Sequence, residues 1–122
     1  MKRLIVALVT ALSLAYCTPV PARDWTTEEK AWAGAALAFT LTDWLQTRNI
    51  AKHPEKWREL NPLLPEHPTL GQVNRHFIRS IAAGAALAHL LPEYRLTILR
   101  VVAIVQFGVT AHNAHLGIRM SF

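Results

Sequence analysis

Residues 26–52 read TTEEKAWAGAALAFTLTDWLQTRNIAK, and this stretch predicts the fold class. Thr26 and Glu29 have the spacing of a capping box, in which each side chain bonds the other residue's backbone N–H at a helix start. No proline interrupts the stretch before Pro54, so we expect one helix from about residue 27 to about residue 52. Such a helix is about 39 Å long, longer than the roughly 30 Å core of a bilayer.

Two further helices are expected. Thr69 and Gln72 have the spacing of a second capping box, and the helix that they begin runs to Pro92. The third helix is expected to begin at Pro92-Glu93, because proline is tolerated in a first turn, and to end at Gly117. We therefore predict an all-α fold, with an N-terminal signal or anchor segment (residues 1–22) followed by a three-helix transmembrane bundle (residues 23–122).

The uncharged runs inside these helices are short for membrane spans. They cover residues 31–42, 80–91 and 101–111, and runs of this length are also typical of buried helices in soluble proteins. Two features favour the membrane. The apolar character surrounds each helix, and basic residues lie near helix ends, where long side chains reach the headgroups. These residues are Lys30, Arg48, Lys52, Arg79, Arg95, Arg100 and Arg119. A soluble periplasmic three-helix protein is the alternative.

The composition narrows the class of protein. The chain has 122 residues, of which 52% are hydrophobic and 17% charged, which suits one domain at most. A single cysteine excludes an internal disulfide and a cysteine-based zinc site. The net charge of +5 suggests anionic partners. Because no nucleic-acid-binding motif is present, we interpret the charge as lipid contact and topology rather than nucleic-acid binding.

Residues 1–22 resemble an export signal. A basic start is followed by the apolar run LIVALVTALSLAY at residues 4–16, and Ala22 suits the position before a signal-peptidase cut. Lipidation at Cys17 and an uncut membrane anchor are the alternatives. Each of the three places residue 23 outside the cytoplasm. The basic residues in and around the proline-rich loop 53–68 place that loop in the cytoplasm. We therefore expect a multi-pass protein of a bacterial inner membrane.

Small residues suggest where helices pack. The sequence AGAALA occurs at residues 33–38 and again at residues 83–88. Each copy contains a pair of small residues four positions apart, Gly34/Ala38 and Gly84/Ala88, and such pairs let helix backbones approach closely in lipid. We expect them to form an interface between the first two helices or the seam of a homodimer.

Asp43 is the polar residue that most needs an explanation, because a carboxylate inside a membrane helix costs about 2.5–3.5 kcal/mol at mid-helix. Gln46 and Thr47 share its helix face. If the loop folds back over this end of the bundle, a polar cluster forms from Asp43, Gln46, Thr47, Glu59, Asn61, His67, His112, Asn113 and His115. Three interpretations remain open: a structural cluster in which Asp43 pairs with a histidine or arginine, a site for a proton or cation, and a zinc or general acid–base site.

The order of these residues resembles a known pattern. The motif Asp43-x-x-Gln46-Thr47, then Glu59-x-Asn61-Pro62-x-Leu64, then His67-Pro68 is similar to that of a group of small uncharacterised bacterial membrane proteins, several of them prophage-borne. The resemblance covers roughly residues 25–122. It implies a helical membrane fold and no established activity, and the transferable positions are Asp43, Thr47, Glu59, Asn61 and Pro62.

Two classes of function follow from the sequence. The first is a non-enzymatic membrane protein without a cofactor, which acts by binding a membrane partner or a second copy of itself. With a prophage origin, preventing phage from entering the cell or a role in lysis would suit it. The second is a membrane-embedded ion-handling or metal-assisted hydrolytic site that uses Asp43, Glu59, His67, His112 and His115, with zinc as the cofactor. No catalytic residue and no metal ligand is assigned.

Overall fold

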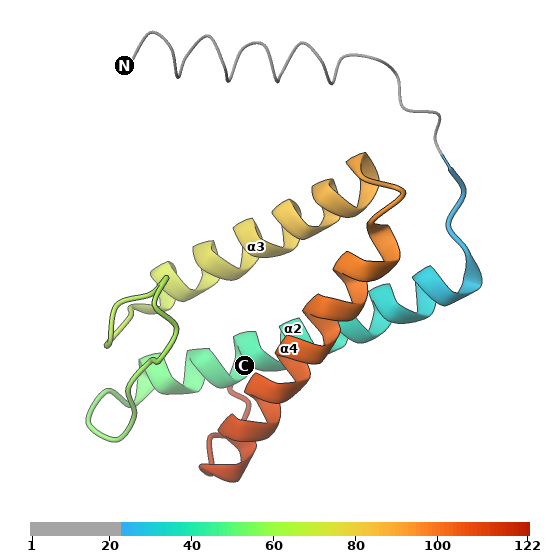
Figure 1. The fold of residues 1–122 in the computed structure, drawn as a ribbon. Coiled ribbons are helices and arrows are strands. Elements are labelled where there is room, and N and C mark those ends of the chain that lie inside the picture. Colours follow the sequence, from blue (N-terminus) through green and yellow to red (C-terminus); the bar gives the residue numbers. More distant parts are fainter. Residues whose placement is uncertain (1–22) are drawn as a thin grey trace, which may run out of the picture.

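The fold is all-α, as predicted. The computed structural model describes residues 23–122, and in this range it has three helices and no strand: α2 (Thr27–Lys52), α3 (Leu70–Leu90) and α4 (Arg95–His115). A short turn joins α3 and α4 into a hairpin whose arms separate away from the turn, and α2 crosses the hairpin and packs mainly against α4 (Figure 1). The predicted export signal and the Cys17 lipidation site lie outside the described residues.

Local signals determine most helix ends. Both predicted capping boxes are present: Glu29 N donates to Thr26 Oγ1 (3.1 Å), and Thr26 N donates to Glu29 Oε2 (2.9 Å), with the same reciprocal pair at Thr69 and Gln72. Each cap contributes about 1 kcal/mol. Gly117 ends α4, as predicted, because its φ of +82° is the left-handed conformation that favours glycine.

The start of α4 differs from the prediction. Residues 92–94 form a turn, in which Tyr94 N donates to Leu91 O (3.0 Å), and the helix begins at Arg95 instead of Pro92-Glu93. The reason is that the chain reverses direction here to pair α4 with α3, so these residues are used for the reversal. No side-chain cap stabilises this helix start.

The apolar core between the helices is small. Its buried members include Val73 and Phe77 of α3, Ala36 of α2 and Ala103 of α4. The Phe77 ring stacks on Trp44 with centroids 5.9 Å apart. Many large apolar side chains point outward, above all on α4, where Val101, Ile104 and Phe107 are more than half exposed; these belong to no core within residues 23–122. A water-soluble monomer rarely exposes so much apolar surface.

One helix of the described part, α4, is long and apolar enough to cross a membrane, and 17% of its apolar window is buried inside the structure. The all-helical part of the prediction is therefore confirmed, whereas the three-span bundle is not, because only one described helix is a candidate span. The physical reason is polar side chains inside the other two helices. The apolar run of α2 is interrupted by Asp43, Gln46 and Arg48, and α3 carries Arg75, His76 and Arg79 within its first half.

A buried ion pair joins the helices at the end where the α3–α4 turn lies. Arg95 and Glu29 have side chains that are each 2% exposed, and Arg95 Nη1 lies 3.5 Å from Glu29 Oε2. Arg95 Nε also donates to Ala88 O (2.7 Å), and its guanidinium lies over the Trp25 ring at 4.5 Å. The expectation that Arg95 extends to lipid headgroups is thus wrong, because its charge is neutralised inside the protein.

We predict that Arg95→Ala lowers the free energy of unfolding by about 3 kcal/mol. It removes the buried partner of the Glu29 carboxylate and leaves only Arg23, whose side chain is about half exposed. The matched control is Arg100→Ala, whose pair with Glu28 is about half exposed and should be worth about 1 kcal/mol or less. Denaturant-induced unfolding of the purified chain, followed by circular dichroism, measures both. Equal losses in the two variants would contradict the prediction.

Candidate functional site

A cavity of about 530 Å³ lies between α2, the loop 53–69 and the second half of α4. We name it the Asp43 cavity. Its polar lining consists of Asp43, Thr47, Arg58, Glu59, Asn61, Gln106, His112 and Asn113. The remaining walls are apolar and include Ile50, Val109 and Ile118. The cavity therefore joins side chains that are far apart in the sequence.

The helix α2 contributes a buried polar stripe. Thr40, Asp43 and Thr47 lie at intervals of three and four residues, which places them on one helix face, and all three are buried. Thr40 uses its hydroxyl within the helix, donating to Ala36 O (2.7 Å). Asp43 and Thr47 are the members of this stripe that reach the cavity.

The loop reaches the cavity because its own polar groups fold it back. Asn61 N donates to Glu59 Oε1 (2.8 Å), Leu63 N donates to Asn61 Oδ1 (2.9 Å), and Glu59 N donates to Glu66 O (2.9 Å). An asparagine that bonds the backbone two residues further on makes a tight turn. These bonds hold Glu59 and Asn61 at the wall of the cavity, so the loop folds back over this end of the helices, as expected.

The helix α4 is attached to α2 beside the cavity by side-chain amides. Gln46 Nε2 donates to Thr110 O (3.2 Å), and Asn113 Nδ2 donates to Gln46 Oε1 (3.3 Å). The C-terminal tail closes the same end, since Ser121 N donates to Leu45 O (3.0 Å) and Asn49 Nδ2 donates to Arg119 O (2.8 Å). Polar contacts therefore position the cavity walls.

The cavity contains more hydrogen-bond acceptors than its donors satisfy. Asp43 is 8% exposed, and the bond that it accepts in the described chain is a long one from Thr47 Oγ1 (3.4 Å). Glu59 Oε2 and Gln106 Oε1 are buried, and neither has a partner among residues 23–122. Glu59 also repels Asp43 electrostatically when both are ionised. Acceptors left in this state favour a ligand that brings positive charge or donors.

Arg58, the arginine that lines the cavity, pairs with a carboxylate outside it. Arg58 Nη1 donates to Glu66 Oε1 (2.8 Å) in an exposed pair. This hydrogen bond and the charge of Arg58 lower the pKa of Glu66 below its ordinary value. Arg58 makes no such bond to Asp43 or Glu59 in the part of the chain that the structure describes. Asp43 therefore forms no ion pair with a described residue, so the expected pairing with a histidine or arginine is absent from residues 23–122.

Most of the predicted polar cluster meets here. Asp43, Thr47, Glu59, Asn61, His112 and Asn113 line the cavity, and Gln46 lies directly behind it. His67 and His115 are exposed and do not line it. His67 follows the exposed Arg58–Glu66 pair, and His115 is the last residue of α4, so neither backbone position brings an imidazole inward.

Gln106 is the residue that sequence analysis missed. It is the single polar residue within the run 101–109 of α4. Such a residue in an otherwise apolar helix usually faces the protein interior, so a signal was present. Its position seven residues before Asn113 also places the two on one helix face.

The predicted small-residue pairs lie in different surroundings. Gly34 and Ala38 are exposed, and a Cβ added at Gly34 would meet no atom within 4 Å. Ala88 is buried, whereas Gly84 also has open space around it. Within the described residues, therefore, Gly34 and Ala38 do not make a close contact between α2 and α3.

Among residues 23–122, no three histidine, cysteine, aspartate or glutamate side chains are close enough together to hold a metal ion. No family model, no curated protein and no solved structure matches the chain.

We predict that Asp43→Asn raises the free energy of unfolding of the ligand-free chain by about 1–3 kcal/mol, because it removes a buried charge that lacks a cationic partner. The control is Glu66→Gln, at an exposed pair, which should change it by less than about 1 kcal/mol. Denaturant unfolding measures both. If Asp43→Asn instead destabilises the chain by several kcal/mol, the carboxylate has a structural role.

Proposed function

We propose that this chain is a small helical membrane protein that binds a cation in the Asp43 cavity. The observation that carries the proposal is the set of oxygen atoms there: the buried Asp43 carboxylate, which accepts one long bond from Thr47, and the unpartnered atoms Glu59 Oε2 and Gln106 Oε1. Carboxylate and amide oxygens are the ligands that hard cations prefer. A protonated amine would satisfy the same acceptors by hydrogen bonding.

The membrane part of the proposal is supported by α4. Its apolar side chains face outward, and they are stabilised if hydrocarbon surrounds them. The export signal predicted in residues 1–22 would place residue 23 in the periplasm. The concentration of basic residues around loop 53–68 supports a cytoplasmic location for that loop. In this orientation the Asp43 cavity lies in the cytoplasmic half of the protein.

We predict that a cation raises the melting temperature of the full chain purified in neutral detergent, because a ligand that binds only the folded state stabilises it. Sodium, potassium, magnesium, calcium and zinc chlorides and a small alkylammonium salt, each at matched ionic strength, are the probes. At one hundred times its dissociation constant the effective cation should contribute about 2.7 kcal/mol.

Asp43→Asn should abolish this stabilisation, and Glu93→Gln, which removes an exposed carboxylate outside the cavity, should retain it. A response to no probe, or an equal response in Asp43→Asn, would contradict cation binding. The zinc arm also addresses the metal-assisted alternative, since a zinc-specific response that depends on Asp43 and His112 would favour it over simple ion handling.

A second candidate function is association with a membrane partner or with a second copy of the chain. It is favoured by the outer face of α2, where exposed Gly34 and Ala38 lie beside Leu37 and Leu41, which are 47% and 41% exposed. Small residues on a lipid-facing helix allow a second helix to approach closely. No described residue covers this face, so a second helix can reach it.

We predict that Gly34→Leu strongly reduces amine-reactive crosslinking of the chain in membrane vesicles, because the added side chain prevents close helix approach. The vesicles are first washed with alkaline carbonate, and the chain should stay in the pellet. Ala82→Leu, which adds similar bulk to an exposed position on α3, is the control. Unchanged crosslinking in Gly34→Leu would argue against this face, and release by carbonate would argue against the membrane location.

A further inference from the structure

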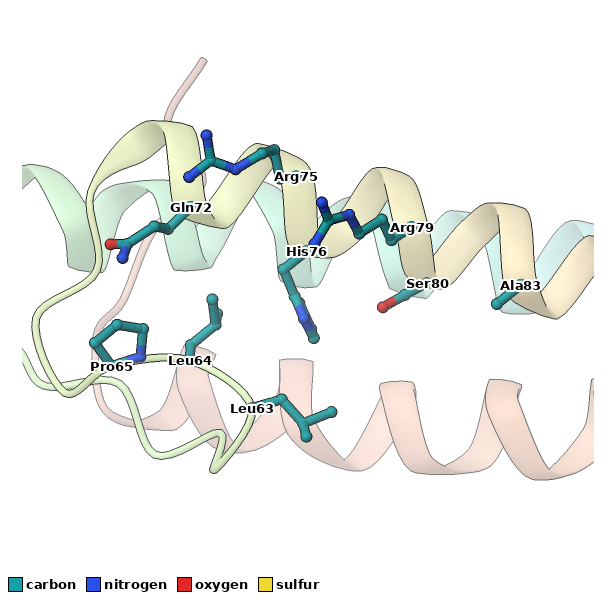
Figure 2. A pocket seen from close by; sticks show the side chains of 9 residues that line it. All are labelled: Leu63, Leu64, Pro65, Gln72, Arg75, His76, Arg79, Ser80 and Ala83. Atoms are coloured by element: carbon teal, nitrogen blue, oxygen red, sulfur yellow. The ribbon is translucent and has the colours of Figure 1, made fainter. Parts of the chain in front are cut away.

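A second cavity, of about 450 Å³, lies between α3 and residues 63–65 of the loop. Figure 2 shows its two sides: Gln72, Arg75, His76, Arg79, Ser80 and Ala83 follow one another along α3, and Leu63, Leu64 and Pro65 lie opposite them. We name it the Arg75 groove. Its lining contains no acidic side chain, whereas that of the Asp43 cavity includes Asp43 and Glu59.

The two arginines of the groove are not neutralised. Among residues 23–122, every glutamate that pairs with an arginine pairs with Arg23, Arg58, Arg95 or Arg100. Arg75 and Arg79 make no ion pair with another described residue, and both are exposed on the same side of α3. Ser80 adds a hydroxyl donor one residue further on.

His76 is oriented toward this groove by the loop. Its Nε2 lies 3.2 Å from Asn61 Nδ2. With Asn61 donating to Nε2, the imidazole carries its proton on Nδ1 and keeps a donor available. The groove therefore combines two guanidinium groups with imidazole, amide and hydroxyl donors. Guanidinium forks match the paired oxygen atoms of a phosphate group.

The same helix face becomes apolar beyond the groove. Residues 72, 76, 79, 83, 86, 87 and 90 lie on one side of a helix with 3.6 residues per turn, and Ala83, Ala86, Leu87 and Leu90 of this set are exposed. The distance from Arg79 to Leu90 along the helix axis is about 16 Å. This nearly equals one leaflet of the hydrocarbon core, about 15 Å.

We infer that the Arg75 groove binds the phosphate headgroup of an anionic phospholipid, with an acyl chain along Ala83, Leu87 and Leu90. A free phosphate would use the basic part and leave this apolar face uncovered, so the face favours a lipid. The inference shares with the proposed function only the membrane location, and the location is consistent, since anionic headgroups attract basic groups at the cytoplasmic surface.

The test uses the full chain in neutral detergent micelles and three probes: phosphatidylglycerol, inorganic phosphate and uncharged diacylglycerol. Melting temperature against probe concentration gives the affinity. We expect a response to phosphatidylglycerol and a much weaker one to the other two. The double variant Arg75→Gln/Arg79→Gln should bind phosphatidylglycerol about a hundredfold more weakly, since each charge-assisted contact is worth roughly tenfold.

The control is Lys30→Gln/Arg119→Gln, which removes the same charge from exposed positions that line neither cavity and should bind like the unaltered chain. Equal phosphatidylglycerol affinity in both double variants would overturn the inference. An equal response to inorganic phosphate or to diacylglycerol would overturn the lipid assignment. The cation response should persist in Arg75→Gln/Arg79→Gln, so failure of lipid binding and failure of cation binding are distinguishable.

Discussion

The buried ion pair between Glu29 and Arg95 determines how the three helices meet. Glu29 belongs to the capping box of α2, and Arg95 is the first residue of α4 and bonds the Ala88 carbonyl of α3. The contacts of Arg95 therefore join the start of α2, the start of α4 and the end of α3. Because the apolar core is small, this polar connection contributes more to the arrangement than it would in a larger protein. At the opposite end of the three helices, side-chain amide contacts and the loop 53–69 hold the helices together.

At that opposite end, Asn61 separates two sites of opposite charge. Its backbone N–H holds Glu59 at the wall of the Asp43 cavity, and its side-chain amide contacts His76 at the wall of the Arg75 groove. The carboxylates on one side of the loop and the guanidinium groups on the other do not neutralise each other. Instead Arg58, which lies beside the carboxylates, pairs with Glu66. The loop thus keeps the two groups of charge apart, and no ion pair joins them among residues 23–122.

The parts of this structure that the sequence predicted are those governed by neighbouring residues. Thr26, Thr69 and Gly117 set helix ends through contacts within a few positions, so their spacing was sufficient. The start of α4 and the burial of Arg95 depend on how the chain reverses between helices, which no local pattern records. Among the candidate site residues, Asp43 and Thr47 could be placed by helix periodicity.

Glu59 and Asn61 could be placed only on the assumption that the loop folds back. The same assumption gave the wrong position for His67, which is exposed. Where a loop side chain points depends on the turns that precede it, and these could not be predicted. Gln106 was visible as a polar residue in an apolar run, but its role appears only when the opposite wall is known.

The distribution of charge along the molecule suits the proposed membrane location. An ionised group at mid-bilayer costs about 2.5–3.5 kcal/mol, and the cost falls toward the interface. In the proposed orientation Asp43, Glu59, Arg75 and Arg79 all lie in the half of the molecule that contains the loop, whereas the outward-facing apolar residues of α4 include Val101 and Ile104 in its first half. The charge that could not be buried cheaply in hydrocarbon is thereby placed near the aqueous surface. At the other end two carboxylates are paired within the described chain: Glu29 with Arg95 and Arg23, and Glu28 with Arg100. In the proposed membrane location, these pairs leave both of these carboxylates partnered, and the two unneutralised sites lie at the cytoplasmic surface, where ions and headgroups reach them.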